Sequence, residues 1–314
     1  MIKKISIVGA RGYVAEELIK IILRHNEFKL GFIGSHSHGG ELVDEIFPAL
    51  AGQNIKFENI QPENIKNFSS EIYVLAVPNG IAKKYVKALK NTPCKIIDLS
   101  YDMRFDNEWV YGLTEKNRKL IRAASKVSNP GCYATGAQLG LAPLLEKLAE
   151  NPVIFGVSGY SGTGRTPSDK NNPKYLYENF LPYQMTEHGH EVEISHHLGR
   201  DVNFIPHVAP HFRGISLTIH FRLKSQLSAS KLLSLFKHYY AQEVLIKVSV
   251  SIPEVQKTAH TPNVNIGGFK MSKRDPNRGV FVVTLDNLLK GAASQAMQNI
   301  NLMFNMPELN GIVE

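Results

Sequence analysis

The first 130 residues of the chain alternate between short, β-branched apolar runs and segments whose apolar residues recur at helical spacing. One run, EIYVLAV at 71–77, is apolar almost throughout and ends at Pro78-Asn79-Gly80, which is typical of a buried strand followed by a turn. Regular alternation of strand and helix predicts a parallel sheet with helices on both faces. The expected strands are 4–8, 29–33, 71–77 and 94–99, and the expected helices are 14–23 and 81–89.

The second half of the chain has a different pattern. Residues 215–223 alternate between apolar and polar side chains, which predicts a half-exposed antiparallel strand, and residues 166–190 are polar and rich in proline, as in a loop. Further strands are expected at 153–157, 244–250, 264–271 and 280–285, and helices at 133–148, 228–240 and 288–304. We therefore predict an α/β fold with two domains: a parallel-sheet domain at 1–131 plus 288–314, and an α+β domain with a mainly antiparallel sheet at 132–287.

Charge and composition exclude several classes of protein. The net charge of +8 comes from dispersed Lys and Arg, and no nucleic-acid-binding motif is present, so small anionic ligands fit better than nucleic acid. No apolar run is long enough to span a membrane, and the N-terminal apolar run is better interpreted as a strand than as a signal peptide. The two cysteines, Cys94 and Cys132, are too few for a disulfide scaffold, so we expect reduced thiols in the cytoplasm.

A glycine-rich turn follows the first strand and opens the first helix. Its G-x-x-G-x-x-A spacing is a variant of the fingerprint in which glycine lets the backbone approach a pyrophosphate and the helix N-terminus stabilises its charge. A plain strand–turn–helix connection is the alternative. The residues expected to bind the dinucleotide here are Gly9, Ala10, Arg11, Gly12, Tyr13 and Val14.

The end of the second strand indicates which dinucleotide is bound. NAD sites usually place Asp or Glu there for the ribose 2′-hydroxyl, whereas this chain has Ser35, His36 and Ser37 and no acid until Glu41. Hydroxyl and imidazole groups, together with Arg11, suit the 2′-phosphate of NADP. We therefore expect NADP(H) as the cofactor, with a merely polar loop as the alternative.

Cys132 follows the sequence Asn129-Pro130-Gly131 and precedes a helical pattern. Because Pro-Gly makes a tight turn, Cys132 is expected at a helix N-terminus, where the helix dipole favours a thiolate. A thiolate attacks well and also leaves well, so it suits a covalent acyl intermediate. The alternative for a single cysteine is a small buried core residue, which is how we interpret Cys94 at the start of an apolar strand.

The segment HGHEVE at 188–193 brings two imidazoles and two carboxylates together. It lacks the H-E-x-x-H pattern, so we predict no metal site. One of these histidines would suit a cysteine nucleophile as general acid and base. The alternative is a solvated loop.

Eight segments, in order along the chain, resemble those of the N-acetyl-gamma-glutamyl-phosphate reductases, a family of NADPH-dependent enzymes of arginine biosynthesis. The resemblance extends from residue 5 to about residue 304. The segments are VGARGYVAEEL (8–18), IDLSYDMR (97–104), VYGLTE (110–115), SNPGCYATG (128–136), SGYSGTGR (158–165), HGHEVEI (188–194), FIPHVAPHFRGI (204–215) and DNLLKGAASQAMQNIN (286–301).

The resemblance implies a fold like that of aspartate-semialdehyde dehydrogenase and glyceraldehyde-phosphate dehydrogenase, and a homodimer or homotetramer. In such a fold, residues 1–131 plus 288–314 form a Rossmann-type NADP-binding domain, and residues 132–287 form the catalytic, substrate-binding and oligomerisation domain. It implies that Cys132 attacks an acyl phosphate, that phosphate leaves, and that NADPH reduces the resulting thioester to an aldehyde. It gives His190 the acid–base role, with His188 and Glu193 holding the site. By the same resemblance, Arg104, Arg165 and Arg213 are candidates for the substrate's phosphate and carboxylate, Ser100 and Asn287 lie near the nicotinamide, Pro78 also contacts the cofactor, and Asn129, Ser161, Gly162 and His207 contact the substrate.

The chain departs from the family pattern at three places. Gly189 stands where Arg is usual, Glu191-Val192 where a small residue and Pro are usual, and Ala15 where many members have Gly. The first two changes remove a cation and add a carboxylate beside the acid–base residue, so the anionic substrate is expected to bind more weakly or in a different arrangement.

Two alternatives to this function stay open. The first is the homologous reductase of the one-carbon-longer aminoadipyl phosphate in lysine biosynthesis. The second is a non-catalytic NADP-binding sensor on the same fold, against which the presence of Cys132, His188 and His190 argues. Aspartate-semialdehyde dehydrogenase itself is a poorer match, because segments 188–194 and 204–215 differ from it.

Overall fold

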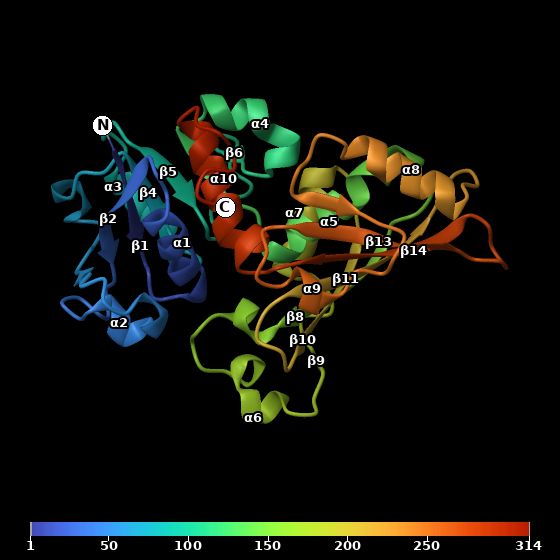
Figure 1. Cartoon of the computed structure of the whole chain (residues 1–314), viewed down its shortest axis with the longest axis horizontal. Coiled ribbons are helices and arrows are strands. Elements are labelled where there is room, and N and C mark those ends of the chain that lie inside the picture. Colours follow the sequence, from blue (N-terminus) through green and yellow to red (C-terminus); the bar gives the residue numbers. More distant parts are fainter. Residues whose placement is uncertain (1, 314) are drawn as a thin grey trace. The chain divides into compact units, whose positions relative to one another are not determined.

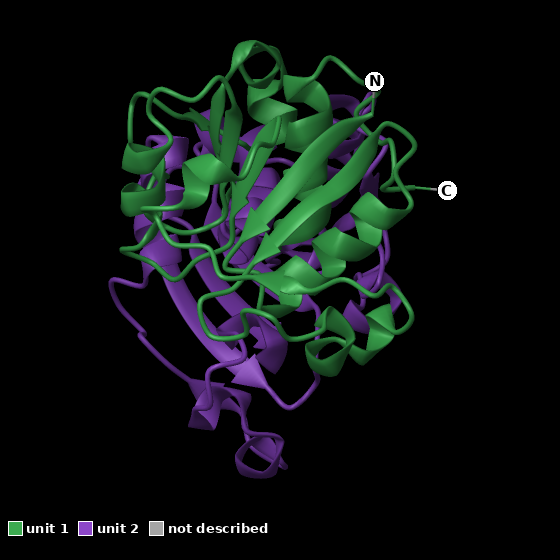
Figure 2. Ribbon diagram, turned by 90° about the vertical axis from the view of Figure 1, so that its left-hand side faces the viewer, with its two compact units in different colours: residues 1–130, 292–314 green, residues 131–291 purple. Residues whose placement is uncertain are grey.

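Two seven-stranded sheets, one in each of two structural units, form the framework of the protein. The computed structural model describes residues 2–313. Unit 1 comprises Met1–Pro130 and Ala292–Glu314, and unit 2 comprises Gly131–Gly291 (Figure 2). The sequence-based boundaries were drawn at 131/132 and 287/288; residues 288–291 lie in unit 2 because Gly291 packs directly against Cys132.

All strands of the unit 1 sheet are parallel, in the order β3-β2-β1-β4-β5-β7-β6. The chain places β2 on one side of β1 and β4 on the other, and in sheets of this kind dinucleotides bind at the carboxyl ends of the strands beside that switch point. The strands are β1 (Lys3–Val8), β2 (Phe28–Gly34), β3 (Phe57–Glu58), β4 (Ile72–Leu75), β5 (Lys95–Asp98), β6 (Val110–Tyr111) and β7 (Lys126–Ser128).

The C-terminal helix α10 (Ser294–Met303) belongs to unit 1 and lies beside α4 (Thr114–Ala123) (Figure 1). It is fully buried although it is rich in amide side chains. The Asn299 amide donates to the Gly112 carbonyl at 2.9 Å and to Asn129 Oδ1 at 3.1 Å. Each such buried group costs about 1–3 kcal/mol if left unpaired, so these bonds specify one packing of α10. The other helices of the unit are α1 (Tyr13–Leu23), α2 (Val43–Ile46) and α3 (Ala82–Ala88), with 3-10 turns at Pro48–Leu50 and Ile65–Asn67.

The unit 2 sheet is mixed, in the order β12-β13-β14-β11-β8-β10-β9. Strand β11 pairs antiparallel with both β8 and β14, and its alternate residues from Ile215 to Phe221 are buried, which confirms the predicted half-exposed antiparallel strand. The strands are β8 (Val153–Gly159), β9 (Leu181–Pro182), β10 (Asn203–Ala209), β11 (Ile215–Arg222), β12 (Ile246–Val248), β13 (Val264–Met271) and β14 (Arg278–Leu285). The predicted fold class, a parallel α/β domain joined to a domain with a mainly antiparallel sheet, is confirmed.

Helix α5 (Cys132–Leu141) packs closely on this sheet because two of its residues are glycines. A Cβ on Gly136 would lie 2.7 Å from the Leu285 side chain, and a Cβ on Gly140 would lie 2.7 Å from that of Ile219. The sheet therefore fixes the helix and, with it, the position of Cys132 at the helix N-terminus. The other helices of unit 2 are α6 (Pro173–Leu176), α7 (Gly189–Leu198), α8 (Ala229–Tyr239) and α9 (Val255–Thr258), with 3-10 turns at Ala142–Lys147, Tyr160–Thr163 and Asp169–Asn171.

Two predicted helices differ from the observed ones. The helix predicted at 133–148 is α-helical only to Leu141 and continues as a 3-10 helix, in which Pro143 has no amide to donate to the α-helical pattern. The helix predicted at 288–304 divides into a π-helical turn, Leu289–Ala293, and α10. Between residues 2 and 313, no helix combines the length and the apolar character needed to cross a membrane.

Candidate active site

Cys132 is the first residue of α5, directly after the N-cap residue Gly131. Its side chain is partly buried, and both Cys132 and Cys94 are thiols. The amides of the first helical turn and the helix dipole favour a negative charge at this position. The predicted placement of Cys132 at a helix N-terminus therefore agrees with the structure.

The turn before the thiol is held by Glu193 on α7. The Glu193 carboxylate is fully buried, and its Oε1 accepts a hydrogen bond from the Gly131 amide at 2.9 Å. Because α7 packs against α5, this bond fixes the turn that presents Cys132. Because the Glu193 carboxylate accepts a backbone amide of this turn, Glu193 is suited to positioning it.

His188 is the N-cap residue of α7, where its Nδ1 accepts the amide proton of His190 at 3.0 Å. An Nδ1 that accepts leaves the proton of the neutral ring on Nε2. Burial, reinforced by the charge of Lys170, lowers the pKa of His188 from 6.5 to about 4. His188 is therefore neutral at physiological pH, and its ring lies 5.0 Å from that of His190.

The lowered pKa of His188 predicts an acid-labile contribution to stability. Unfolded His188 binds a proton near pH 6.5 and folded His188 only near pH 4, so the free energy of unfolding should fall as the pH falls from about 6.5 to 4. We expect this group to account for about 2–3 kcal/mol of the loss. Urea unfolding of the wild type and of His188→Asn at pH 7 and pH 4 measures it, because the Asn amide still caps α7 but does not titrate. Equal losses in both proteins would contradict the prediction.

Two tyrosines surround the thiol. The Tyr133 hydroxyl donates to the His207 carbonyl at 2.9 Å, and its ring lies 5.6 Å from that of His190. Burial raises the pKa of both Tyr133 and Tyr183, and a negative charge on Cys132 raises both further. Both phenols therefore stay protonated beside the thiol. The sequence analysis missed Tyr183, which lies in a polar, proline-rich segment with no motif to mark it.

The turn that packs against Cys132 is organised by Asp286. Its buried carboxylate accepts the amides of Leu288 and Leu289 at 2.9 and 3.0 Å, and it forms a bidentate ion pair with Arg213 at 2.7 and 2.9 Å. The His260 amide also donates to it, at 2.6 Å. Arg213, which was predicted to bind the substrate, therefore faces Asp286 in this structure and holds the turn that leads to Gly291.

Gly291 approaches Cys132 so closely that no side chain fits between them. A Cβ on Gly291 would lie 2.7 Å from Cys132 Cβ and 3.1 Å from the Asp286 carbonyl oxygen. We expect Gly291→Ala to displace the thiol and to lower kcat by about 100-fold, since an error of about 1 Å in a reacting group has that cost. Steady-state kinetics and the rate of Cys132 alkylation measure the two effects. An unchanged kcat with unchanged thiol reactivity would disprove the role of this contact.

The predicted cofactor residue Asn287 and the predicted substrate residues Ser161, Gly162 and His207 of unit 2 divide into two sets. Asn287 Oδ1 accepts the Gly214 amide at 2.6 Å and its Nδ2 donates to Ser161 Oγ at 2.9 Å, while Gly162 lies beside this pair. His207 instead contacts the rings of Phe155 and Phe180, at centroid distances of 4.5 and 4.7 Å.

Arg165 lies on a loop whose conformation is fixed by a residue that was not predicted from the sequence. The amide of Asn171 donates to the carbonyl oxygens of Gly164 and Thr166, at 2.8 and 2.7 Å, and so fixes the backbone on both sides of Arg165. Asn171 was not among the predicted site residues. A single Asn in a polar loop carries no signal in the sequence.

The departure at Glu191 has a structural explanation. Glu191 Oε1 accepts the Glu187 amide at 3.2 Å, and its Oε2 accepts the Phe204 amide at 2.7 Å. This carboxylate thus joins the start of α7 to β10. The carboxylate that this chain has in addition to the family pattern therefore accepts hydrogen bonds from two backbone amides. Val192 is exposed.

The glycine-rich turn of unit 1 fits a pyrophosphate. Gly9 has φ +81°, and a Cβ there would lie 2.7 Å from the Ala76 carbonyl oxygen, so only glycine suits this position. The amides of Gly9 and Ala10 both donate to the Gly34 carbonyl, at 2.9 and 3.0 Å, which ties the turn to the end of β2. Gly12 is the N-cap residue of α1, and the space where its Cβ would lie is open. The N-terminus of α1, which begins at Tyr13 and Val14, is therefore not covered by a cap side chain.

The residues after β2 differ in exposure. Ser35 is buried, and its hydroxyl accepts the His38 amide at 3.2 Å. His36 and Ser37 are exposed, as is Arg11 on the adjoining turn. These three side chains are accessible to a charged group of a dinucleotide at this end of the sheet.

The remaining predicted site residues of unit 1 lie on the loops that follow the strands, and hydrogen bonds connect these loops to one another. Asp98 accepts both the amide and the hydroxyl of Ser100, at 3.1 and 2.8 Å, and burial raises the pKa of Asp98. Arg104 donates to the carbonyl oxygens of Asn129 at 3.1 Å and Leu99 at 3.3 Å, so its guanidinium holds the ends of two strands. Pro78 lies on the loop after β4, where the next residues contact Tyr101 and Asp102.

Among residues 2–313, no three His, Cys, Asp or Glu side chains are grouped as metal ligands.

Comparison with known proteins defines the class first. A family model for the semialdehyde dehydrogenase NAD-binding domain matches residues 4–124, and one for the semialdehyde dehydrogenase dimerisation domain matches residues 132–287. The crystal structure of aspartate semialdehyde dehydrogenase II from Vibrio cholerae has a TM-score of 0.78 at 17% identity, over 97% of this chain and 99% of that one. The aspartate semialdehyde dehydrogenase of Candida albicans has a TM-score of 0.71 at 15% identity, over 96% and 99%. The fold is that of the semialdehyde dehydrogenases, and unit 1 is a nicotinamide-dinucleotide-binding domain.

Proteins of known name then define the family within this class. The N-acetyl-gamma-glutamyl-phosphate reductase of Xanthomonas campestris pv. campestris (strain 8004) is 46% identical over 310 residues, 98% of each chain. That of Stenotrophomonas maltophilia is 44% identical over 98% of this chain and 97% of its own. The chain belongs to the N-acetyl-gamma-glutamyl-phosphate reductase family, and is thus an oxidoreductase. The resemblance stated from its sequence is confirmed.

Proposed function

We propose that the protein reduces N-acetyl-gamma-glutamyl phosphate to N-acetylglutamate 5-semialdehyde and phosphate, with NADPH, in arginine biosynthesis. The observation that carries the proposal is the 46% identity, over 98% of both chains, to a reductase of that name. It is supported by a thiol at the N-terminus of a buried helix, with a carboxylate and two histidines on the neighbouring helix.

Cys132 is the proposed nucleophile. Its thiolate adds to the acyl carbonyl carbon, the bond to the phosphate oxygen breaks, and a thioester forms on Cys132. The bound nicotinamide supplies the hydride that the thioester carbon accepts. His190 exchanges a proton with the oxygen of the resulting thiohemiacetal, and the C–S bond then breaks to release the aldehyde and Cys132. Glu193 and His188 hold the two helix N-termini that carry these groups.

The substrate's anionic groups are assigned to the candidate residues of each unit. Arg165, Ser161 and Gly162 are proposed substrate contacts in unit 2, and Arg104 and Asn129 in unit 1. Asn287 and Ser100 are proposed to contact the nicotinamide. For Arg213 we propose a positioning role through Asp286, because its guanidinium already forms a bidentate pair.

NADPH is proposed in preference to NADH. The support is the exposed group of Arg11, His36 and Ser37 beside the end of β2, where an acid that would hold the 2′-hydroxyl of NAD is missing from the sequence. The aspartate semialdehyde dehydrogenase of Candida albicans, which has a similar fold, is described as a structure with NADP.

Arg11→Ala tests the cofactor preference. Loss of one charge-assisted hydrogen bond to the 2′-phosphate should raise the KM for NADPH by about tenfold and leave the KM for NADH unchanged. Arg24→Ala, at the other end of α1, is the matched control and should change neither value. An equal rise in the KM for NADPH and for NADH would instead indicate that Arg11 contacts the pyrophosphate, which both cofactors share.

The reverse reaction tests the function. Purified protein is mixed with N-acetylglutamate 5-semialdehyde, phosphate and NADP, and NADPH absorbance is followed beside the same assay with the one-carbon-longer aldehyde. A phosphate-dependent rate with the first aldehyde is expected. A faster rate with the longer aldehyde would indicate that the protein reduces aminoadipyl phosphate. No activity with either aldehyde would favour a non-catalytic dinucleotide-binding sensor.

We also propose a cytoplasmic homodimer or homotetramer. The support is the match of residues 132–287 to a dimerisation-domain model. Sedimentation velocity at micromolar concentration tests it, and a monomer would reject it.

A further inference from the structure

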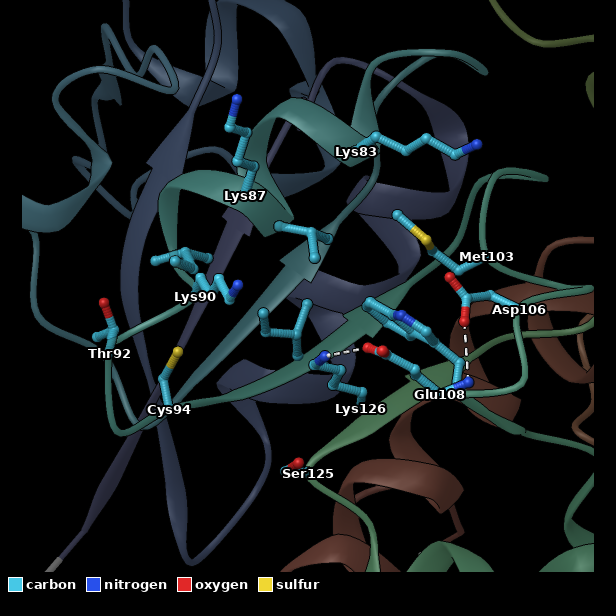
Figure 3. A pocket seen from close by; sticks show the side chains of 14 residues that line it. Lys83, Lys87, Lys90, Thr92, Cys94, Met103, Asp106, Glu108, Ser125 and Lys126 are labelled. Atoms are coloured by element: carbon cyan, nitrogen blue, oxygen red, sulfur yellow. Dashed lines mark hydrogen bonds and ion pairs between the residues drawn. The ribbon is translucent and has the colours of Figure 1, made fainter.

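A cavity of about 450 Å³ lies in unit 1 (Figure 3), and no residue of the glycine-rich turn lines it. It is formed by α3, the start of β5 and the segment 103–109. None of the residues assigned to the dinucleotide or the substrate lines it. Its volume falls within the range of small-molecule sites, about 300–1,000 Å³. The lining residues include Lys83, Val86, Lys87, Leu89, Lys90 and Trp109.

The floor of this cavity is apolar and belongs to the core of unit 1. Leu89, Met103 and Trp109 are buried members of one hydrophobic cluster, and Val86 and Cys94 pack against that cluster. Because these side chains are fixed by the core behind them, the cavity is preformed. Burial raises the pKa of the Cys94 thiol, as expected for a group in weakly polar surroundings.

The rim of the cavity carries four lysines and the two carboxylates of Asp106 and Glu108, so its net charge is positive. Lys83 and Lys87 lie one turn apart on α3, and Lys90 lies just after the end of that helix; all three are exposed. Lys126, on the opposite side, pairs with Glu108 at 3.3 Å (Figure 3). Of the four lysines, Lys126 alone has a carboxylate partner in the described part of the chain, so the rim on α3 keeps its positive charge.

We propose that this cavity binds a small carboxylic acid with a branched or cyclic hydrocarbon body. The hydrocarbon would lie on the floor formed by Leu89, Met103 and Trp109, and the carboxylate would lie among the lysines of α3. Burial of the body supplies affinity and the charge supplies selectivity, since an uncharged molecule of the same shape gains nothing from the rim. The site is independent of the proposed reaction.

Trp109 reports on this site directly, because it is the only tryptophan of the chain. The intact protein is titrated with cyclohexanecarboxylate and, separately, with cyclohexanemethanol, and Trp109 emission is followed. We expect a saturable change with the acid and at least about fivefold weaker binding of the alcohol, the order that exposed charge pairs produce. A second readout uses Cys132→Ser, in which Cys94 is the only thiol: the acid, more than the alcohol, should slow alkylation of Cys94.

Charge reversal of two lysines of the rim gives the decisive comparison of binding affinities. Lys87→Glu combined with Lys90→Glu should weaken binding of the acid by about tenfold, whereas Lys84→Glu, on the same helix but outside the lining, should not. These residues are exposed, so the variants are expected to fold. Equal affinities for acid and alcohol, or equal binding by both variants, would overturn the proposal. So would a dimer that the double variant dissociates, because this face would then contact a second copy of the chain.

Discussion

Replacement of Cys132 by serine is expected to lower kcat by a factor on the order of 10⁴–10⁶, because the reaction would lose its covalent nucleophile. Serine is close to isosteric with cysteine, but its hydroxyl is not ionised at the N-terminus of α5. The dinucleotide should still bind, since the glycine-rich turn lies in unit 1 and Cys132 in unit 2. Steady-state turnover and fluorescence titration with NADPH measure the two quantities.

Cys94→Ser is the matched control for this experiment. Cys94 lies beside an apolar cluster of unit 1 and has no part in the proposed chemistry, so the variant should keep wild-type turnover. Mass spectrometry after rapid quenching should find an acyl adduct on the wild type and on Cys94→Ser, but not on Cys132→Ser. Substantial turnover by Cys132→Ser would falsify the thioester mechanism.

The second large effect is expected from the buried pair of Arg213 and Asp286. Asp286→Leu should lower the free energy of unfolding by about 3–5 kcal/mol, because it leaves a buried guanidinium without its carboxylate. The same change removes the acceptor for the amides of His260, Leu288 and Leu289. Urea unfolding followed by circular dichroism measures the loss.

Arg213→Met should cost less, about 1–3 kcal/mol, because three backbone amides still bind the Asp286 carboxylate. The double variant should be more stable than the sum of the single losses predicts, since it leaves no unpaired charge. If Arg213 instead served only to bind substrate, Arg213→Met would raise the KM and leave unfolding unchanged. The free energy of unfolding of Arg213→Met therefore decides between the two roles of Arg213.

Local patterns in the sequence were sufficient to predict the fold. Strands such as β4 and β11 were recognised because burial on two faces or on one leaves a continuous or an alternating apolar pattern. The division of the C-terminal helix was not predictable in this way. The π-helical turn at Leu289–Ala293 follows Asp286, which pairs with Arg213, and its Gly291 lies against Cys132; both of these contacts join residues far apart in the sequence.

The candidate site shows the same division between local and long-range information. The position of Cys132 followed from a Pro-Gly turn next to a helical pattern. The groups that hold that position lie far away in the sequence: Glu193 bonds the Gly131 amide across 62 residues, and Asp286 pairs with Arg213 across 73. Tyr183 and Asn171 were missed because single polar residues in a loop have no periodic pattern. Sequence motifs mark the reacting group, whereas the residues that orient it become visible only when the chain is folded.

The discontinuity of unit 1 has a consequence for biosynthesis. A ribosome synthesises residues 131–291, all of unit 2, before it reaches α10, which unit 1 needs for its core. Until then, the Gly112 carbonyl and the Asn129 side chain lack the Asn299 amide that satisfies them in the finished protein. Unit 2 can therefore fold during translation, while unit 1 is completed only when the C-terminal segment emerges. A nascent chain that stalls before residue 292 would carry all of unit 2 and an incomplete unit 1.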